Sequence, residues 1–268
     1  MGLDTLRSLG LLGHGLRMLI ESFPYDYLYG CIGADIIFAK GLAKLHEHSH
    51  SWEVGWSVLQ EASSPAQEAF AYGYLSHLAA DTVAHNHFIP ECLVRTYPAK
   101  TFRHIYWEIR FDAFVRRELW DLAKEIAGLP LAEDDDLMEK VVKRTLFSFR
   151  TDKRIFHSLI MINRMHQWQR MLQNHSGKSV WKLHGRDFTR YRNLSSRVNL
   201  DFLVHLDRAA CLRQDPIGKQ ALHSAKWLKK TLRALQKKGE LEPGVYQRIL
   251  LSFQPDKDGF PSPLLTKS

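Results

Sequence analysis

Apolar residues recur at helical spacing along most of the chain. Residues 3–21 place leucine or isoleucine at intervals of three and four, and residues 52–62 repeat the pattern over a shorter length. This spacing puts the apolar side chains on one face of an α-helix. A further helix is predicted to begin at residues 63–65 and to end before Pro90, because the residue preceding a proline disfavours the α conformation. Residues 101–127 are predicted to form one long helix.

The remaining residues keep this helical character. The stretch 198–238 has helical spacing with a break at Asp215 and Pro216, and no stretch of the sequence shows strand alternation, an Asn-Gly hairpin or an internal repeat. We therefore expect an all-α fold, a single multi-helix domain with a helical C-terminal extension. Its expected parts are a core of residues 1–130, helices within 131–258 that complete or extend the same domain, and a tail of residues 259–268.

Composition narrows the class of protein. The chain has 268 residues, of which 45% are hydrophobic and 25% charged, as in a soluble globular protein. No apolar run approaches the roughly 18 residues of a membrane span. The three cysteines are far apart and form no CxxC pair, so a disulfide framework is not expected. The N-terminus lacks the features of a signal peptide, so a cytoplasmic location is expected from the sequence as it stands.

The net charge of +8 is concentrated in one region. Residues 171–240 contain 15 Lys or Arg against 5 Asp or Glu. Such a region is attracted to anionic membrane surfaces or to phosphate-bearing substrates, although a solvated face of basic helices has the same composition. Charge alone does not choose between lipid and nucleic acid.

The candidate chemistry centres on the helix predicted before Pro90. His77, Asp81 and His85 are four residues apart and share one face of that helix. Two imidazoles and a carboxylate within an apolar helix are costly to bury unless a partner satisfies them. A divalent metal would do so, and nitrogen with carboxylate ligands suits zinc.

Other ligand-type residues flank this row. Asp35 stands alone among apolar neighbours, where it is either a ligand or a helix cap. His46, His48 and His50 alternate, so a regular helix cannot aim all three at one centre. His104 and Glu108 are again four apart. The residues alone leave His48 or His50 open, and likewise His85 or His87.

The number of these side chains exceeds the needs of one tetrahedral zinc and suits two or three. Asp81, in the middle of its row, is well placed to bridge two metals. Bridged metals generate hydroxide at neutral pH and clamp a phosphoryl group during in-line displacement. The pattern therefore indicates phosphoester hydrolysis.

At this point the sequence resembles the zinc-dependent phospholipase C family. The resemblance rests on GYLSHLAADTVAHNHF, YGCIGADI, HSHSW and HIYWE, and it extends more loosely over residues 3–115. It implies an all-α domain that binds three zinc ions. One site would take Asp35, His50, His77 and Asp81; a second would take His85 or His87 with His104 and Glu108. Asp35, Asp81 and Glu108 are the implied catalytic positions.

The sequence departs from the family pattern in two ways. The secreted bacterial enzymes and fungal nucleases have a histidine six residues after the central aspartate, which selects His87, whereas glycosylphosphatidylinositol phospholipase D has it four residues after, which selects His85. Helix geometry favours His85, because six residues turn 120° off the face. The family holds its third zinc with an N-terminal Trp and a nearby His, and nothing before Leu3 supplies that pair. We expect a truncated start, with secretion or a periplasmic location if a signal peptide is missing.

The expected function is zinc-dependent hydrolysis of phospholipid phosphodiesters of the phospholipase C/D type, through a metal-bound hydroxide. A zinc nuclease acting on single-stranded nucleic acid is the rival enzyme, although the Pro-x-His that its branch shows after the aspartate is absent. The third alternative is a non-catalytic scaffold stabilised by zinc. The expected partners are a phospholipid or other phosphodiester substrate and an anionic membrane surface that residues 171–240 touch peripherally.

Overall fold

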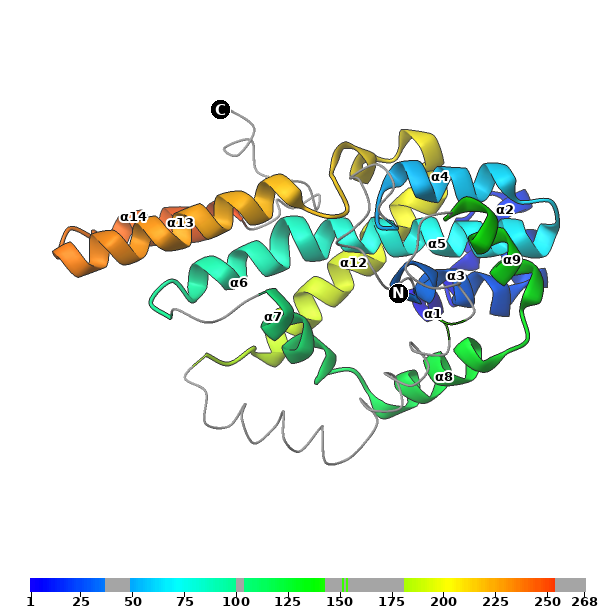
Figure 1. The fold of residues 1–268 in the computed structure, drawn as a ribbon, viewed down its shortest axis with the longest axis horizontal. Coiled ribbons are helices and arrows are strands. Elements are labelled where there is room, and N and C mark those ends of the chain that lie inside the picture. Colours follow the sequence, from blue (N-terminus) through cyan, green and yellow to red (C-terminus); the bar gives the residue numbers. More distant parts are fainter. Residues whose placement is uncertain (37–48, 100–103, 143–150, 152, 154–180, 254–268) are drawn as a thin grey trace.

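The computed structural model describes residues 1–36, 49–99, 104–142, 151, 153 and 181–253, and every regular element in these ranges is a helix (Figure 1). Since these ranges contain no strand, the predicted all-α fold is confirmed. No helix within them is long and apolar enough to cross a membrane. The predicted division at residue 130 stays a prediction, and the predicted tail lies outside the described residues.

The N-terminal region is more broken than its apolar pattern suggests. The one helix predicted over 3–21 is wrong: the chain forms α1 (Gly2–Leu6), a short 3₁₀ helix η1 (Leu9–Leu11) and α2 (His14–Ser22). Gly13 has extended backbone angles and precedes α2 directly. The next helix, α3 (Pro24–Ile36), begins at a proline. Proline is favoured at the first helical position because an N–H group there would have no partner inside the helix.

The centre of the molecule is the pair α3 and α5 (Pro65–Val83), which lie against each other over much of their length. Glycines allow this close approach. A Cβ atom at Gly30 would lie 1.9 Å from the carbonyl oxygen of Phe70, and one at Gly73 would lie 2.0 Å from that of Tyr27. The backbones therefore touch, and the side chains at the ends of the two helices meet in one place.

Two caps confirm the predicted starts of neighbouring helices. Helix α4 (Trp52–Glu61) packs on α5, and the Ser51 side chain accepts a hydrogen bond from the Val54 N–H. At the start of α5 the Ser64 side chain accepts one from the Gln67 N–H. Serine at this position satisfies an N–H group that has no partner inside the helix.

The helix that carries the histidine row does not end before Pro90, so that prediction is wrong. Helix α5 continues through a π-helical turn, η3 (Ala84–Phe88), into α6 (Ile89–Arg95), and the three form one rod through the molecule (Figure 1). A π-turn inserts an extra residue into the helix. Pro90 then occupies one of the first positions of α6, where a missing N–H is tolerated.

The long helix predicted over 101–127 is also wrong in its described part. The chain instead forms α7 (His104–Asp112) and α8 (Arg117–Gly128), separated at Arg116, whose backbone is extended. Phe111 and Phe114 pack on Phe188 with ring centroids 4.7 and 5.2 Å apart. These contacts with a distant segment cannot be read from local periodicity.

The remaining helices close the fold around α5 and α6. Helix α9 (Ala132–Val141) follows α8, and α12 (Gly185–His205) packs along α5. Two short 3₁₀ helices, η4 (Leu206–Arg208) and η5 (Ala210–Arg213), lead to the predicted break at Asp215 and Pro216. Helix α13 (Lys219–Lys238) then lies along α6, followed by α14 (Pro243–Ser252) (Figure 1).

Candidate metal centre

Side chains from the end of α3, the segment before α4, α5, the π-turn η3 and α7 form two neighbouring groups of ligand-type atoms. The first group contains Asp35, His50 and His77, and the second contains His85, His104 and Glu108. Within each group, the ligand atoms lie within 4.8 Å of one another. The structure therefore gathers most of the residues that the sequence predicts as ligands.

The first group has the spacing of a zinc site. His50 Nε2 lies 3.2 Å from Asp35 Oδ1, 3.3 Å from His77 Nε2 and 3.5 Å from Asp81 Oδ2. His77 Nε2 lies 3.3 Å from Asp81 Oδ2 and 4.0 Å from Asp35 Oδ2. Ligand atoms at the corners of a zinc tetrahedron with bonds of about 2.1 Å are roughly 3.3 Å apart. Asp35, His50 and His77 thus have the spacing for one ion, and Asp81 lies at a similar distance from the two imidazoles.

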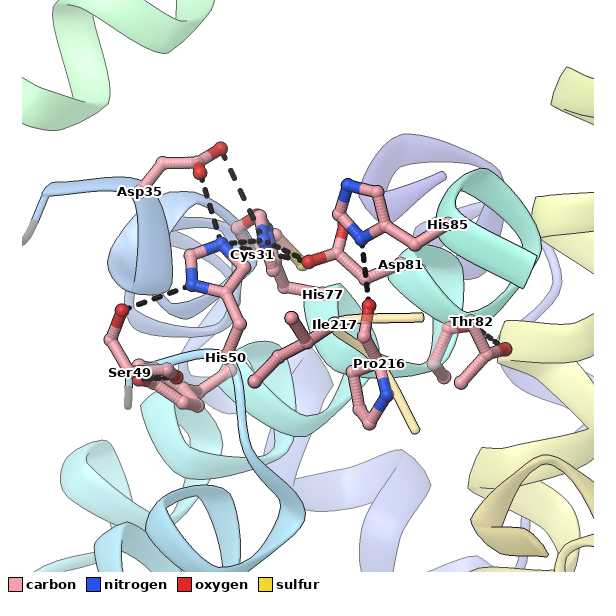
Figure 2. A network of polar contacts seen from close by, with 12 residues as sticks. Cys31, Asp35, Ser49, His50, His77, Asp81, Thr82, His85, Pro216 and Ile217 are labelled. Atoms are coloured by element: carbon pink, nitrogen blue, oxygen red, sulfur yellow. Dashed lines mark hydrogen bonds and ion pairs between the residues drawn. The ribbon is translucent and has the colours of Figure 1, made fainter. Parts of the chain in front are cut away.

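The imidazoles are aimed by contacts at their other ring nitrogen. His50 Nδ1 lies 3.0 Å from Ser49 Oγ, His77 Nδ1 lies 3.0 Å from the Cys31 carbonyl oxygen, and His85 Nδ1 lies 2.7 Å from that of Pro216 (Figure 2). A carbonyl oxygen accepts, so Nδ1 of His77 and of His85 carries the proton and Nε2 can offer its lone pair. Such partners are typical of metal-binding histidines, whose orientation and tautomer they fix.

The short segment before α4 is tied to α5. Tyr74 donates a hydrogen bond to the Ser49 carbonyl oxygen, and both residues are buried. His50 follows directly and is itself buried. The hydrogen bond from α5 and the burial therefore hold in place a side chain that lies outside any helix.

Asp81 lies between the two groups. Burial alone would raise the pKa of this carboxyl, but the charges of His77 and His85 outweigh burial and lower its pKa to about 2. The buried Oδ2 atom has ion-pair contacts of 3.3 Å with His77 and 3.5 Å with His50, but no described residue donates a well-aligned hydrogen bond to it. A buried carboxylate oxygen in this state is costly. A cation shared with the surrounding imidazoles would satisfy it, so the donor set fits a metal.

The second group is built on α7 and the start of the π-turn. Glu108 Oε1 lies 2.7 Å from His104 Nε2 and 3.5 Å from His85 Nε2. Burial would raise the Glu108 pKa, but the hydrogen bonds from His104 and His85 outweigh burial and lower its pKa to about 2. The carboxylate is thus ionised and ready to bind a cation.

The same carboxylates hold protons on the imidazoles. Burial would lower the pKa values of His77 and His85, but the charge of Asp81 outweighs it, and both pKa values rise to about 9. Positive charge is therefore favoured at this centre. Metal binding would replace these protons, since a ligating imidazole is neutral at the ligating nitrogen.

His87 faces away from both groups. It is buried, and its Nδ1 lies 3.3 Å from the carbonyl oxygen of Phe253, beyond the end of α14. The structure therefore brings His85 and not His87 to Glu108, in the direction that helix geometry favours. His46 and His48 lie outside the described residues.

Asp112 was not identified from the sequence. It is four residues after Glu108 and borders the same cavity as Asp81 and Glu108. Burial, with the charges of Glu108 and Asp35, raises the pKa of Asp112 to about 7. The spacing His104, Glu108, Asp112 repeats that of the α5 row and could have pointed to it.

The site remains open to solvent at its carboxylates. The Asp35 side chain is 49% exposed and that of Glu108 is 46% exposed, whereas His50 is 7% exposed. His50 thus lies on the buried side of the centre and the two carboxylates on its exposed side. A substrate can approach from the side of Asp35 and Glu108.

Comparison with known proteins decides the family. A family model described as zinc dependent phospholipase C matches residues 2–162, which include both groups. The chain belongs to the zinc-dependent phospholipase C family. No curated protein and no solved structure matched the chain. This family is one of hydrolases, and its dependence on zinc agrees with the donor set described above.

Proposed function

We propose that this member of the zinc-dependent phospholipase C family hydrolyses phospholipid phosphodiesters at the centre around Asp81. The observation that carries the proposal is the pair of ligand groups joined by one buried carboxylate. Bound zinc would supply the chemistry by lowering the pKa of a water molecule and by neutralising charge on the phosphoryl group. Two ions held close together would in addition clamp the attacking and leaving oxygens of an in-line displacement, as two adjacent groups allow.

The chain's own residues have separate roles in this proposal. Asp35, His50, His77 and Asp81 would hold one ion, and His85, His104 and Glu108 a second. Asp81 would also face the second ion. The exposed carboxylates Asp35 and Glu108 would border the entering phosphodiester and hold the ions in place, and the ions, not the carboxylates, would neutralise its developing negative charge. The third zinc of the family stays a prediction.

Zinc content tests the ligand assignment. Purified protein is expected to retain at least two zinc ions, and His77→Ala and Glu108→Ala are each expected to lose about one, because each removes a ligand from a different group. His223→Ala and Glu118→Ala, at exposed positions of α13 and α8, are the matched controls. Unchanged zinc content in both site variants would overturn the assignment.

Parallel assays test the substrate class. The zinc-loaded protein is expected to hydrolyse phosphatidylcholine in mixed micelles faster than it hydrolyses single-stranded DNA. The reverse order would favour a zinc nuclease. Tightly held zinc without hydrolysis of any phosphodiester would favour a non-catalytic scaffold.

Peripheral membrane contact through α13 is the second part of the proposal. This helix contains seven Lys or Arg and no acidic residue, and its Trp227 is 59% exposed beside the exposed Lys226 and Lys230. Lysine and tryptophan together suit an anionic membrane surface. Sedimentation with phosphatidylserine vesicles is expected to weaken in Trp227→Ala and at high salt. Equal sedimentation in low and high salt would contradict this contact.

A further inference from the structure

A cavity of about 620 Å³ lies directly beside the metal centre. Asp81, Glu108 and Asp112 border it, and so do residues of α1, α3, α8 and α12. It is therefore bordered by helices from distant parts of the chain. None of the ligand groups requires this space.

The walls of the cavity are mainly hydrocarbon. Leu28 and Ile32 contribute from α3, Leu119, Leu122 and Ala123 from α8, and Phe188 from α12. The charged residues Arg7, Arg116 and Arg192 are exposed as well as lining it, so the cavity meets solvent at their side. It is thus an apolar space with ligand carboxylates at one border and arginines at another.

Protein interiors are packed densely, and an apolar space of this size is more typical of a ligand site than of a core. Its volume corresponds to about 20 groups of about 30 Å³, the share of one water molecule in the liquid and close to that of one methylene. One long hydrocarbon chain would fit. The apolar walls offer no hydrogen bonds to a nucleotide base or a phosphate, and both groups would lose their hydrogen bonds to water there.

We propose that this cavity binds a hydrocarbon chain of the substrate while the phosphodiester lies at Asp81 and Glu108. The inference rests on the proposed function and adds a specificity determinant to it: the protein would select amphiphiles that place a long chain and a phosphodiester within reach of each other. Chain binding contributes affinity through burial of apolar surface, which is independent of zinc chemistry.

Filling the cavity tests this inference. Ala123→Phe places an aromatic ring in the cavity, and Ala234→Phe makes the same change at an exposed position of α13. The zinc-loaded proteins are titrated with a fluorescent analogue of palmitate. Ala123→Phe is expected to bind it at least about tenfold more weakly than the parent, the effect of displacing two methylene groups. Ala234→Phe is expected to bind it as the parent does.

A second variant covers the case in which the first does not fold. Leu119→Gln keeps the size of a lining side chain but adds an amide that the hydrocarbon would desolvate. Leu251→Gln, at a leucine that is 60% exposed, is its control. Probe binding equal to the parent in the folded cavity variant, or equal loss in its control, overturns the inference.

Kinetics separate this inference from the proposed function. Bis(p-nitrophenyl) phosphate is a phosphodiester without a chain, so its hydrolysis by zinc-loaded Ala123→Phe is expected to match the parent, while the KM for long-chain phosphatidylcholine rises. Hydrolysis of neither substrate by the parent would reject the proposed function, and the probe titration would still decide the cavity. If the parent binds the probe only when the probe forms vesicle-like aggregates, and not as single molecules, the cavity proposal is rejected and the proposed function is left intact.

Discussion

At the scale of single residues, the centre depends on what holds each imidazole from behind. His50 stands outside any helix, and its Nδ1 contacts Ser49 Oγ. Contacts of this kind commonly change metal affinity when they are removed. The orientation of His50 is therefore open to test without touching a ligand.

Ser49→Ala is expected to weaken zinc binding about 10- to 100-fold, because the His50 ring loses its partner. Competition with a coloured zinc chelator measures the affinity. Ser57→Ala, which removes a hydroxyl that donates only to the Glu53 carbonyl on α4, is expected to leave it unchanged. Equal affinities for all three proteins would show that the Ser49 contact does not position His50.

A second residue-scale prediction concerns the buried carboxyl of Asp134. It is 1% exposed, and no described residue donates a hydrogen bond to either of its oxygens. Burial, with the charges of Asp26 and Asp135, raises its pKa to about 8, whereas the ordinary value is 3.8. The folded protein therefore keeps a proton that the unfolded chain releases above about pH 4. The free energy of unfolding therefore falls as the pH rises from about 4 to about 8, because the unfolded chain releases this proton and the folded protein does not.

Asp134→Asn removes that loss because an amide carries no charge. Above pH 8 the variant is expected to be roughly 1–3 kcal/mol more stable than the parent, with a much smaller difference at pH 4, where the loss has scarcely begun. Urea unfolding at the two pH values measures this, and Asp207→Asn at an exposed position serves as control. A parent whose stability does not fall over this range would contradict a protonated Asp134.

Residue types and spacing revealed much of the candidate centre. The pairs His77 with Asp81 and His104 with Glu108 were predictable, because helical spacing alone puts both members on one face. The choice between His48 and His50 was not predictable, because the position of His50 depends on the contact between Tyr74 and the Ser49 carbonyl oxygen. That contact joins residues far apart in the sequence.

At the scale of elements, the glycines between α3 and α5 decide whether the two helices can bring their ligands together. A Cβ at Gly73 would lie 2.0 Å from the Tyr27 carbonyl oxygen, which is backbone and cannot move aside without shifting α3. Gly73→Ala is expected to lower the free energy of unfolding by roughly 1–3 kcal/mol and to reduce zinc retention.

The matched change is Gly15→Ala in α2, where a Cβ would meet nothing within 4 Å. It is expected to raise stability by roughly 0.5–1 kcal/mol, because alanine is the better helix former. Chemical unfolding and zinc analysis compare the two variants. Similar effects of both changes would mean that α3 and α5 do not need their close contact.

Element boundaries were the least predictable part of the fold. A rule that ends a helix before proline assumes regular α geometry, and the π-turn Ala84–Phe88 breaks that assumption just before Pro90. The break between α7 and α8 depends on aromatic contacts with α12. Both departures come from tertiary packing, which outweighs local preference.

At the scale of the whole molecule, the helical class and the ligand-bearing core followed from periodicity, but the part played by the C-terminal helices did not. Helix α12 packs on α5, and Trp52 at the start of α4 donates a hydrogen bond of 2.8 Å to the Gln214 carbonyl oxygen. Segments whose sequences show no ligand pattern therefore support the helices that carry the centre. Only the three-dimensional arrangement reveals this.

The turn before α13 lies directly against the π-turn. The Pro216 carbonyl oxygen accepts from His85 Nδ1 at 2.7 Å, and the Asp215 carbonyl accepts from the Asn86 side chain at 2.9 Å. A Cβ at Gly218 would lie 2.3 Å from the His85 carbonyl oxygen. A ligand-bearing segment and a turn more than a hundred residues later thus share their contacts.

This shared contact couples two equilibria. If zinc holds His85 in place, local opening of residues 215–218 must also displace a bound ion, so zinc raises the free energy of that opening. By reciprocity, a turn kept closed strengthens zinc binding by the same factor. Amide hydrogens of the turn are therefore expected to exchange with solvent deuterium more slowly in zinc-loaded protein than in chelator-treated protein, while those of the distant α2 keep their rates.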